Sequence, residues 1–148
     1  MENKWIGIMG SPKCTPAMDQ YLSKLMTKAI NDRVFIMFGD EPTGVPMYIA
    51  QRLKAENVDP KLYSVCTPVG SHPRNWDKLE GKARAERKRF EDYLSRNYNI
   101  VDFADSTVLI WSGEDELTRL TWEYAQHSNR KCTLVNFFNG GPKIECNM

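Results

Sequence analysis

Three carboxylates stand next to one another immediately after an apolar, β-branched run at residues 107–111. Such a run is typical of a strand buried on both faces, so Glu114, Asp115 and Glu116 would emerge together at its end. Glu114 or Glu116 could act as the nucleophile or general acid/base that cleavage of an N-glycosidic bond requires. The alternative is an acidic turn that complements the dipole of the following helix. Arg119 is placed to pair either with these carboxylates or with a ligand phosphate.

A second candidate is the turn that joins the first apolar run to a helix. Gly10, Ser11 and Lys13 lie in this turn, and Thr15 is placed to cap a helix that begins at Pro16. Backbone amides at such a helix start can cradle a phosphate. The alternative is a plain strand-to-helix connection, since the sequence has no G-x-G-x-x-G or Walker pattern.

The third candidate is an acidic, glycine-flanked segment after the second apolar run. Gly39, Asp40, Glu41 and Gly44 belong to it. A carboxylate at this place in a nucleotide-binding domain accepts hydrogen bonds from ribose hydroxyls. An acidic turn with Thr43 as a helix cap explains the same residues without a ligand.

Strand-like and helix-like segments alternate along the chain and would position these residues. Apolar runs predict strands at 5–9, 34–38, 62–66, 107–111 and 131–137, and apolar positions at helical spacing predict helices at 16–30, up to about 55, at 78–96, and from Leu117 with Thr118 as its cap. We therefore expect one α/β, Rossmann-like three-layer domain over residues 1–148, with a five-stranded parallel sheet in the order 3-2-1-4-5 and a C-terminal tail at 138–148. In that order the loops after the first and fourth strands diverge, which opens a ligand-binding crevice.

The composition bounds the kind of protein. With 148 residues, 41% hydrophobic and 26% charged, the chain has the make-up of an ordinary globular domain. The 20 basic residues barely exceed the 19 acidic ones, so nucleic acid is unlikely as the main partner. No apolar run is long enough for a membrane span, so we expect a cytoplasmic protein without a membrane partner. The four cysteines are widely spaced, which favours reduced thiols over a metal site; Cys14, near a helix start, could have a lowered pKa.

Taken together, these motifs resemble those of the SLOG superfamily, Rossmann-like domains that include cytokinin-activating phosphoribohydrolases, DNA-processing proteins and relatives of nucleoside deoxyribosyltransferases. The matching positions, in chain order, are Gly10-Ser11, Gly39 with Gly44-Val45 and Ala50, Arg96-Asn97 with residues 104–108, Trp111-Ser112-Gly113, and Thr118-Arg119 with Ala125. Two departures are Pro46, where the second element often has Asp, and Leu117, which replaces the Gly before Thr-Arg. The catalytic P-G-G-x-G-T-x-x-E motif is absent.

The resemblance implies a nucleotide-type ligand and a homo-oligomer, most simply a homodimer. It adds Arg96, Asn97, Ser112, Gly113 and Thr118 to the expected ligand-binding residues. We therefore expect a nucleotide or nucleotide derivative in the crevice between strands 1 and 4, with neither a metal nor a resident cofactor. If the protein is an enzyme, it hydrolyses or transfers at the N-glycosidic bond. Two alternatives remain open: a sensor or sequestering protein without chemistry, and a flavodoxin-like FMN-binding protein.

Overall fold

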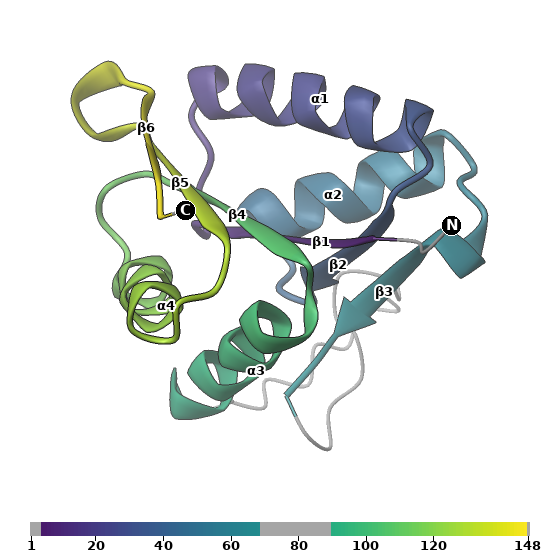
Figure 1. Ribbon diagram of the computed structural model, residues 1–148. Helices are drawn as coiled ribbons and strands as arrows, with labels where there is room; N and C mark the ends of the chain where they lie inside the picture. The colour runs from purple at the N-terminus through teal and green to yellow at the C-terminus, as the bar shows by residue number, and fades with distance from the viewer. Residues whose placement is uncertain (1–3, 69–89, 148) are drawn as a thin grey trace.

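The computed structural model describes residues 4–68 and 90–147 as a mostly parallel sheet with helices on both faces (Figure 1). The strands are β1 (Trp5–Gly10), β2 (Phe35–Gly39), β3 (Tyr63–Cys66), β4 (Ser106–Trp111), β5 (Cys132–Asn136) and β6 (Lys143–Cys146). The α-helices are α1 (Pro16–Asn31), α2 (Gly44–Ala55), α3 (Phe90–Phe103) and α4 (Glu116–His127), and short 3-10 helices span Pro60–Leu62 and Phe138–Gly140. The alternation of strands and helices predicted from the sequence is confirmed.

The sheet has the order β3-β2-β1-β4-β5-β6. The first five strands are parallel and follow the expected order 3-2-1-4-5. The expectation of five strands was wrong, because β6 adds to the outer edge of β5 in the antiparallel direction. The segment expected to be a tail therefore folds back through a turn and satisfies the backbone groups of an edge strand.

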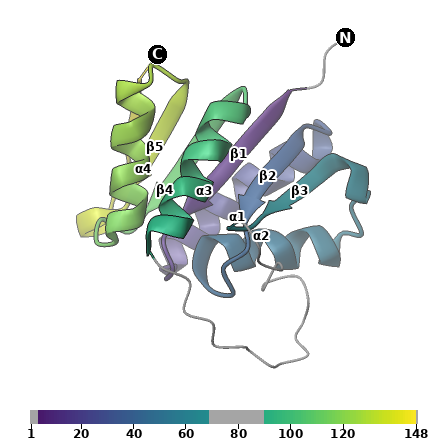
Figure 2. The same ribbon diagram turned by 90° about the horizontal axis from the view of Figure 1, so that it is seen from below.

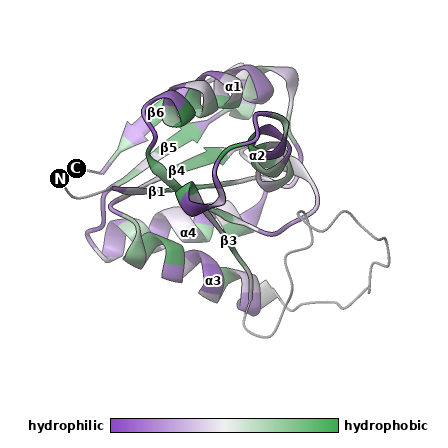
Figure 3. Cartoon of the chain, turned by 90° about the vertical axis from the view of Figure 1, so that its right-hand side faces the viewer, coloured by the Kyte–Doolittle hydropathy of each residue, from purple (hydrophilic) through white to green (hydrophobic). Residues whose placement is uncertain are grey.

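The helices cover the two faces of the sheet in pairs. Figure 2 shows α3 and α4 lying across one face, while α1 and α2 lie on the other. Strand residues alternate between the two layers: Ile8 and Ile110 pack with Leu22 of α1, whereas Met9 packs with Trp122 of α4. The apolar colour in Figure 3 is accordingly concentrated between the helical layers. Burial on both faces explains why the strands are nearly continuous apolar runs.

Two helix boundaries bear on the site. The side chain of Thr15 accepts a hydrogen bond from the backbone N–H of Met18 at 3.2 Å, which confirms Thr15 as the cap of α1. The helix predicted at 78–96 is described only from Phe90, and residues 78–89 lie outside the described residues. Its described part continues to Phe103, so Arg96 and Asn97 lie within a helix rather than at its end. No helix among the described residues is long and apolar enough to cross a membrane.

Candidate ligand-binding site

The loops after β1 and β4 are joined through the side chain of Ser11, which is fully buried. Its hydroxyl donates to the carboxylate of Asp115 and accepts the backbone N–H of Ser112 at 2.8 Å. The backbone of Ser11 is also engaged, since its N–H donates to the carbonyl of Ile110 at 3.0 Å and its carbonyl accepts the N–H of Val45. Ser11 thus fixes the point where the two loops separate.

Asp115 links that junction to the start of α4. Its carboxylate accepts the backbone N–H of Thr118 at 3.0 Å, and its backbone carbonyl accepts the indole N–H of Trp111 at 2.9 Å. The prediction that Thr118 caps this helix was wrong: Asp115 is the cap, and Thr118 is a buried residue of the first turn. Both residue types are good caps, so the sequence alone did not decide between them.

The segment between β2 and α2 packs directly against the loop after β1. Gly44 has a φ of +68°, and a Cβ there would collide with the backbone of Ser11 and Pro12. Only glycine meets both demands at low cost. Thr43 occupies the cap position of α2, but its side chain makes no capping hydrogen bond.

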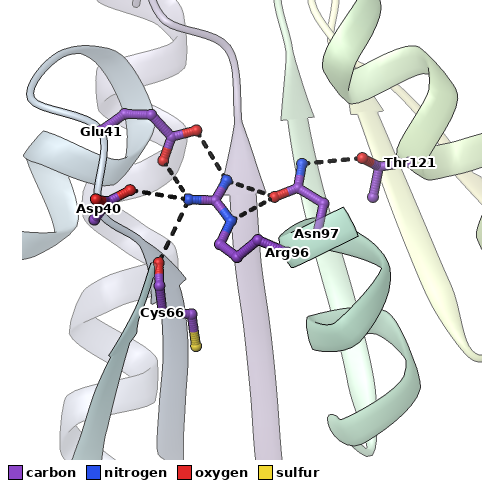
Figure 4. Close-up of polar contacts among 6 residues, drawn as sticks. All are labelled: Asp40, Glu41, Cys66, Arg96, Asn97 and Thr121. Atoms are coloured by element: carbon purple, nitrogen blue, oxygen red, sulfur yellow. Dashed lines mark hydrogen bonds and ion pairs between the residues drawn. The ribbon is translucent and has the colours of Figure 1, made fainter. Parts of the chain in front are cut away.

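Arg96 is the centre of a buried polar cluster, and Figure 4 shows its polar contacts with Asp40, Glu41, Cys66 and Asn97. Its guanidinium donates two hydrogen bonds to the Glu41 carboxylate, one of 2.8 Å from Nη1 and one of 2.9 Å from Nη2. Nη1 also lies 3.3 Å from Oδ1 of Asp40 and 3.5 Å from the carbonyl oxygen of Cys66. Nε and Nη2 donate to the side-chain oxygen of Asn97 at 2.9 and 2.5 Å. The cluster joins α3 to the ends of β2 and β3.

Burial and charge act in opposite directions on Arg96, whose side chain is 4% exposed. Burial alone would lower its pKa, but the hydrogen bonds and charge of Glu41, together with the charge of Asp40, outweigh burial and raise it. The guanidinium therefore stays charged, and the two carboxylates are held in its field. Asp40 is fully buried, whereas Glu41 retains 18% exposure of its side chain.

A cavity of about 260 Å³, here called the crevice cavity, opens beside these two clusters. It is lined by Gly10, Pro12, Glu41, Pro46, Tyr93, Asp115, Glu116 and Leu117. Its walls thus come from the end of β1 and the loop after it, the loop after β2, the start of α2, the described start of α3 and the start of α4. Among the described residues, no lysine or arginine lines it, so its charged groups are carboxylates.

The structure brings some of the expected site residues to this cavity and places others behind or outside it. Gly10, Glu41 and Glu116 line it, and Gly39 lies beside Glu41 and Arg96. Asn97 and Thr118 are buried, and Gly113 packs against Phe138. Lys13 and Glu114 are exposed, and Arg119 pairs with Glu116 and Glu123 along α4.

Sequence reasoning did not nominate Pro12, Pro46, Tyr93 or Leu117 as lining residues. Tyr93 and Leu117 belong to the apolar stripes of their helices, which indicate burial without indicating what is buried against them. Only their position in the fold identifies them, since Leu117 lies in the first turn of α4 and Tyr93 near the described start of α3. A second cavity, of about 310 Å³, lies between the C-terminal ends of α1 and α2 and the start of β2, away from these residues.

For the part of the chain that it describes, the structure argues against two kinds of chemistry, a reactive Cys14 thiol and a metal site. Burial, followed by the charge and hydrogen bond of Asp19, raises the pKa of Cys14 to about 11, so the idea of a lowered pKa was wrong. Such a thiol stays protonated near neutral pH and is a poor nucleophile. Among the described residues, no group of three His, Cys, Asp or Glu side chains is arranged to hold a metal ion.

No protein-family model and no curated protein sequence matches the chain. Solved structures do match. The molybdenum cofactor binding protein of Rippkaea orientalis has a TM-score of 0.63 at 19% identity, with 92% of this chain and 78% of that one covered. DNA processing protein A of Helicobacter pylori, studied for its single-stranded DNA binding mode, has a TM-score of 0.65 at 16% identity, and this chain spans only 64% of it.

The Moco carrier protein of Chlamydomonas reinhardtii has a TM-score of 0.50 at 14% identity over 95% of this chain and 79% of that one. Identities this low show a shared architecture and leave ligand and activity open. The chain therefore shares the Rossmann-like α/β fold of these proteins, which is the fold that its resemblance to the SLOG superfamily implies.

Proposed function

We propose that the protein binds a nucleotide or a nucleotide-derived small molecule in the crevice cavity. The observation that carries this proposal is the position of the cavity, at the carboxyl ends of β1 and β4, where the order of the sheet reverses. Open α/β sheets bind their ligands at this place. The mixture of apolar side chains, a tyrosine ring and a few carboxylates is typical of small-molecule sites.

The charges around the cavity suggest how such a ligand would lie. Glu41 is the carboxylate available to ribose hydroxyls, because Asp40 is fully buried behind it. The ring of Tyr93 offers a surface on which a base can stack. The ribose and base would therefore occupy the carboxylate-lined cavity.

The phosphate would lie at the mouth of the cavity, toward the first turn of α4. The backbone N–H groups of Glu116 and Leu117 belong to that turn and lack intrahelical acceptors. Exposed Lys13 and partly exposed Arg119 supply positive charge nearby in the fold. The ion pairs of Arg119 with Glu116 and Glu123 are solvent-exposed and hence weak, so a phosphate can compete for the guanidinium. Ser112 and Gly113 would complete this edge of the site.

A second candidate ligand is the molybdenum cofactor, which two of the structural neighbours bind or carry by their names. Like a nucleotide, it joins a nitrogen heterocycle to a phosphate, so the same walls would serve. The DNA-processing neighbour adds single-stranded DNA as a third ligand to be tested. The near-zero net charge argues for the small molecules over the nucleic acid.

Catalysis, if present, would be cleavage at the N-glycosidic bond. Both Glu114 and Glu116 are exposed, but Glu116 lines the cavity and Glu114 does not, so Glu116 is the better placed carboxylate. It would attack the anomeric carbon, or activate a water for that attack, as the bond to the base breaks.

We further propose that the protein acts as a homodimer in the cytoplasm. A sedimentation mass of twice the 17.1 kDa chain supports the dimer, and a lone 17.1 kDa species contradicts it.

The experiment is a calorimetric titration of the purified protein with AMP, GMP, FMN, molybdenum cofactor and a single-stranded oligonucleotide. Mass spectrometry of the supernatant after denaturation identifies any ligand that copurifies. Saturable binding of a mononucleotide supports the proposal, binding of the molybdenum cofactor alone supports the second candidate, and bound FMN would support a flavin protein. Chromatography of the same mixtures detects released base; release by the wild type but not by Glu116→Gln assigns the chemistry to Glu116.

A further inference from the structure

A chain of buried hydrogen bonds joins the two walls of the crevice cavity, and it begins at Glu41. Glu41 lines one wall and is held by both terminal nitrogens of Arg96. Arg96 in turn donates to Asn97, whose side-chain amide donates to the hydroxyl of Thr121 at 3.0 Å. That hydroxyl donates at 2.8 Å to the carbonyl of Leu117, which lines the opposite wall.

The members of this chain are shielded from water. Arg96 is 4%, Asn97 3% and Thr121 0% exposed. Hydrogen bonds in such surroundings are stronger than at the surface, and losing one partner leaves a costly unsatisfied group. This series of hydrogen bonds therefore couples the two walls. A displacement of Glu41 shifts the guanidinium of Arg96 and, through Asn97 and Thr121, the first turn of α4.

Arg96 lies behind Glu41 and is not itself among the lining residues of the cavity. Its five donors are directed at Glu41, Asp40, Asn97 and the carbonyl of Cys66 (Figure 4). We propose that Arg96 is a positioning residue, which does not touch the ligand but sets the Glu41 wall at a fixed spacing from the α4 wall. This rests on the proposed function only in taking the crevice cavity as the binding site.

Lysine cannot replace Arg96 in this role. The guanidinium is planar and presents its donors in a rigid fork, which is what grips both oxygens of Glu41 while Nε reaches Asn97. An ammonium keeps the charge but has no such fork. Arg96→Lys thus separates geometry from charge.

The test uses the full-length chain, with AMP and GMP as probes in calorimetric titrations. Arg96→Lys is compared with Arg52→Lys, a matched control that bridges α2 to Ser23 and Thr27 of α1 away from the crevice cavity. We expect Arg96→Lys to weaken probe binding about tenfold or more, and Arg52→Lys to leave it within about twofold. In a Glu41→Gln background, Arg96→Lys should weaken binding by a clearly smaller factor than in the wild type, because Glu41 forms one of the two walls that Arg96 positions. Additive losses, or no loss, would overturn the proposal.

Hydrogen exchange without any ligand tests the same coupling separately. Arg96→Lys should speed amide exchange in residues 39–46 and in 115–121, while Arg52→Lys changes neither segment. Thr121→Val removes the hydroxyl that links Asn97 to the carbonyl of Leu117 and preserves the side-chain volume. This substitution should speed amide exchange in residues 115–121 alone. Unchanged exchange in either wall of Arg96→Lys refutes the coupling. If the wild type binds neither AMP nor GMP, the nucleotide proposal fails, and the exchange data still decide the role of Arg96.

Discussion

The hydroxyl of Ser11, the first residue after β1, donates a hydrogen bond to the carboxylate of Asp115, which caps α4. These two residues are 104 positions apart in the chain. Their contact ties together the two loops that diverge around the crevice cavity. The contact therefore fixes the base of the crevice cavity, where the loops after β1 and β4 meet.

Removing that hydroxyl should destabilise the fold. Ser11→Ala leaves an oxygen of Asp115 and the N–H of Ser112 without their partner in a buried place, at a cost of about 1–3 kcal/mol. Urea denaturation measures the difference, with Ser95→Ala on the exposed face of α3 as the control. Equal midpoints for Ser11→Ala and the wild type would show that the contact contributes nothing to stability.

Gly44 should be far less tolerant of alanine than Gly140. Both have positive φ, +68° and +95°, so both substitutions carry the left-handed penalty of about 1–2 kcal/mol. A Cβ at Gly44 also collides with the backbone of Ser11 and Pro12, whereas at Gly140 it meets nothing within 4 Å. Thermal unfolding should therefore rank Gly44→Ala well below Gly140→Ala. Equal losses would mean that the loop after β1 yields to the added methyl group.

The buried thiol of Cys14 should make stability fall at alkaline pH. Its pKa rises from 9.0 to about 11 on folding, so the folded state holds the proton longer than the unfolded state. The resulting stabilisation is complete below pH 9.0 and is lost as pH rises toward about 11. The free energy of unfolding of Cys14→Ala should accordingly fall less over this range than that of the wild type. Parallel curves for the two proteins would contradict the shift.

Arg119→Ala should weaken mononucleotide binding by at least about 1.5 kcal/mol if the phosphate lies at the first turn of α4, because it removes a charge-assisted bond to an anion. Lys28→Ala is the matched control, since Lys28 forms a comparable exposed pair with Asp32 on α1. Calorimetric titration gives both affinities. Wild-type affinity in Arg119→Ala would move the phosphate elsewhere, with Lys13 as the next residue to test.

Local sequence signals predicted the elements well because those signals are physical constraints of the elements themselves. Thr15 followed by Pro16 specifies a helix start, and strands buried on both faces have few alternatives to continuous apolar runs. β6 was missed because its polar–apolar alternation, Lys-Ile-Glu-Cys, is only four residues long and is too short to indicate a strand. Only pairing with β5 makes it a strand.

The site was harder to predict because its contacts join distant positions. The sequence nominated Glu41 and Arg96 separately, but their ion pair spans 55 positions and leaves no local trace. The sequence therefore could not show that Arg96 binds Glu41 from behind and does not itself line the cavity. Tyr93 illustrates the same limit, since its place in an apolar stripe does not show that it faces a cavity.

The most direct test of the account is to map mononucleotide binding onto the backbone amides by NMR, using ¹⁵N-labelled protein titrated with AMP and GMP. The account predicts that the largest shifts fall at Gly10, Glu41 and Leu117, around the crevice cavity. Shifts gathered instead at Val34, Val58 and Leu62, around the second cavity, would place the ligand at the wrong end of the sheet and contradict the account. The absence of any saturable shift would contradict nucleotide binding itself.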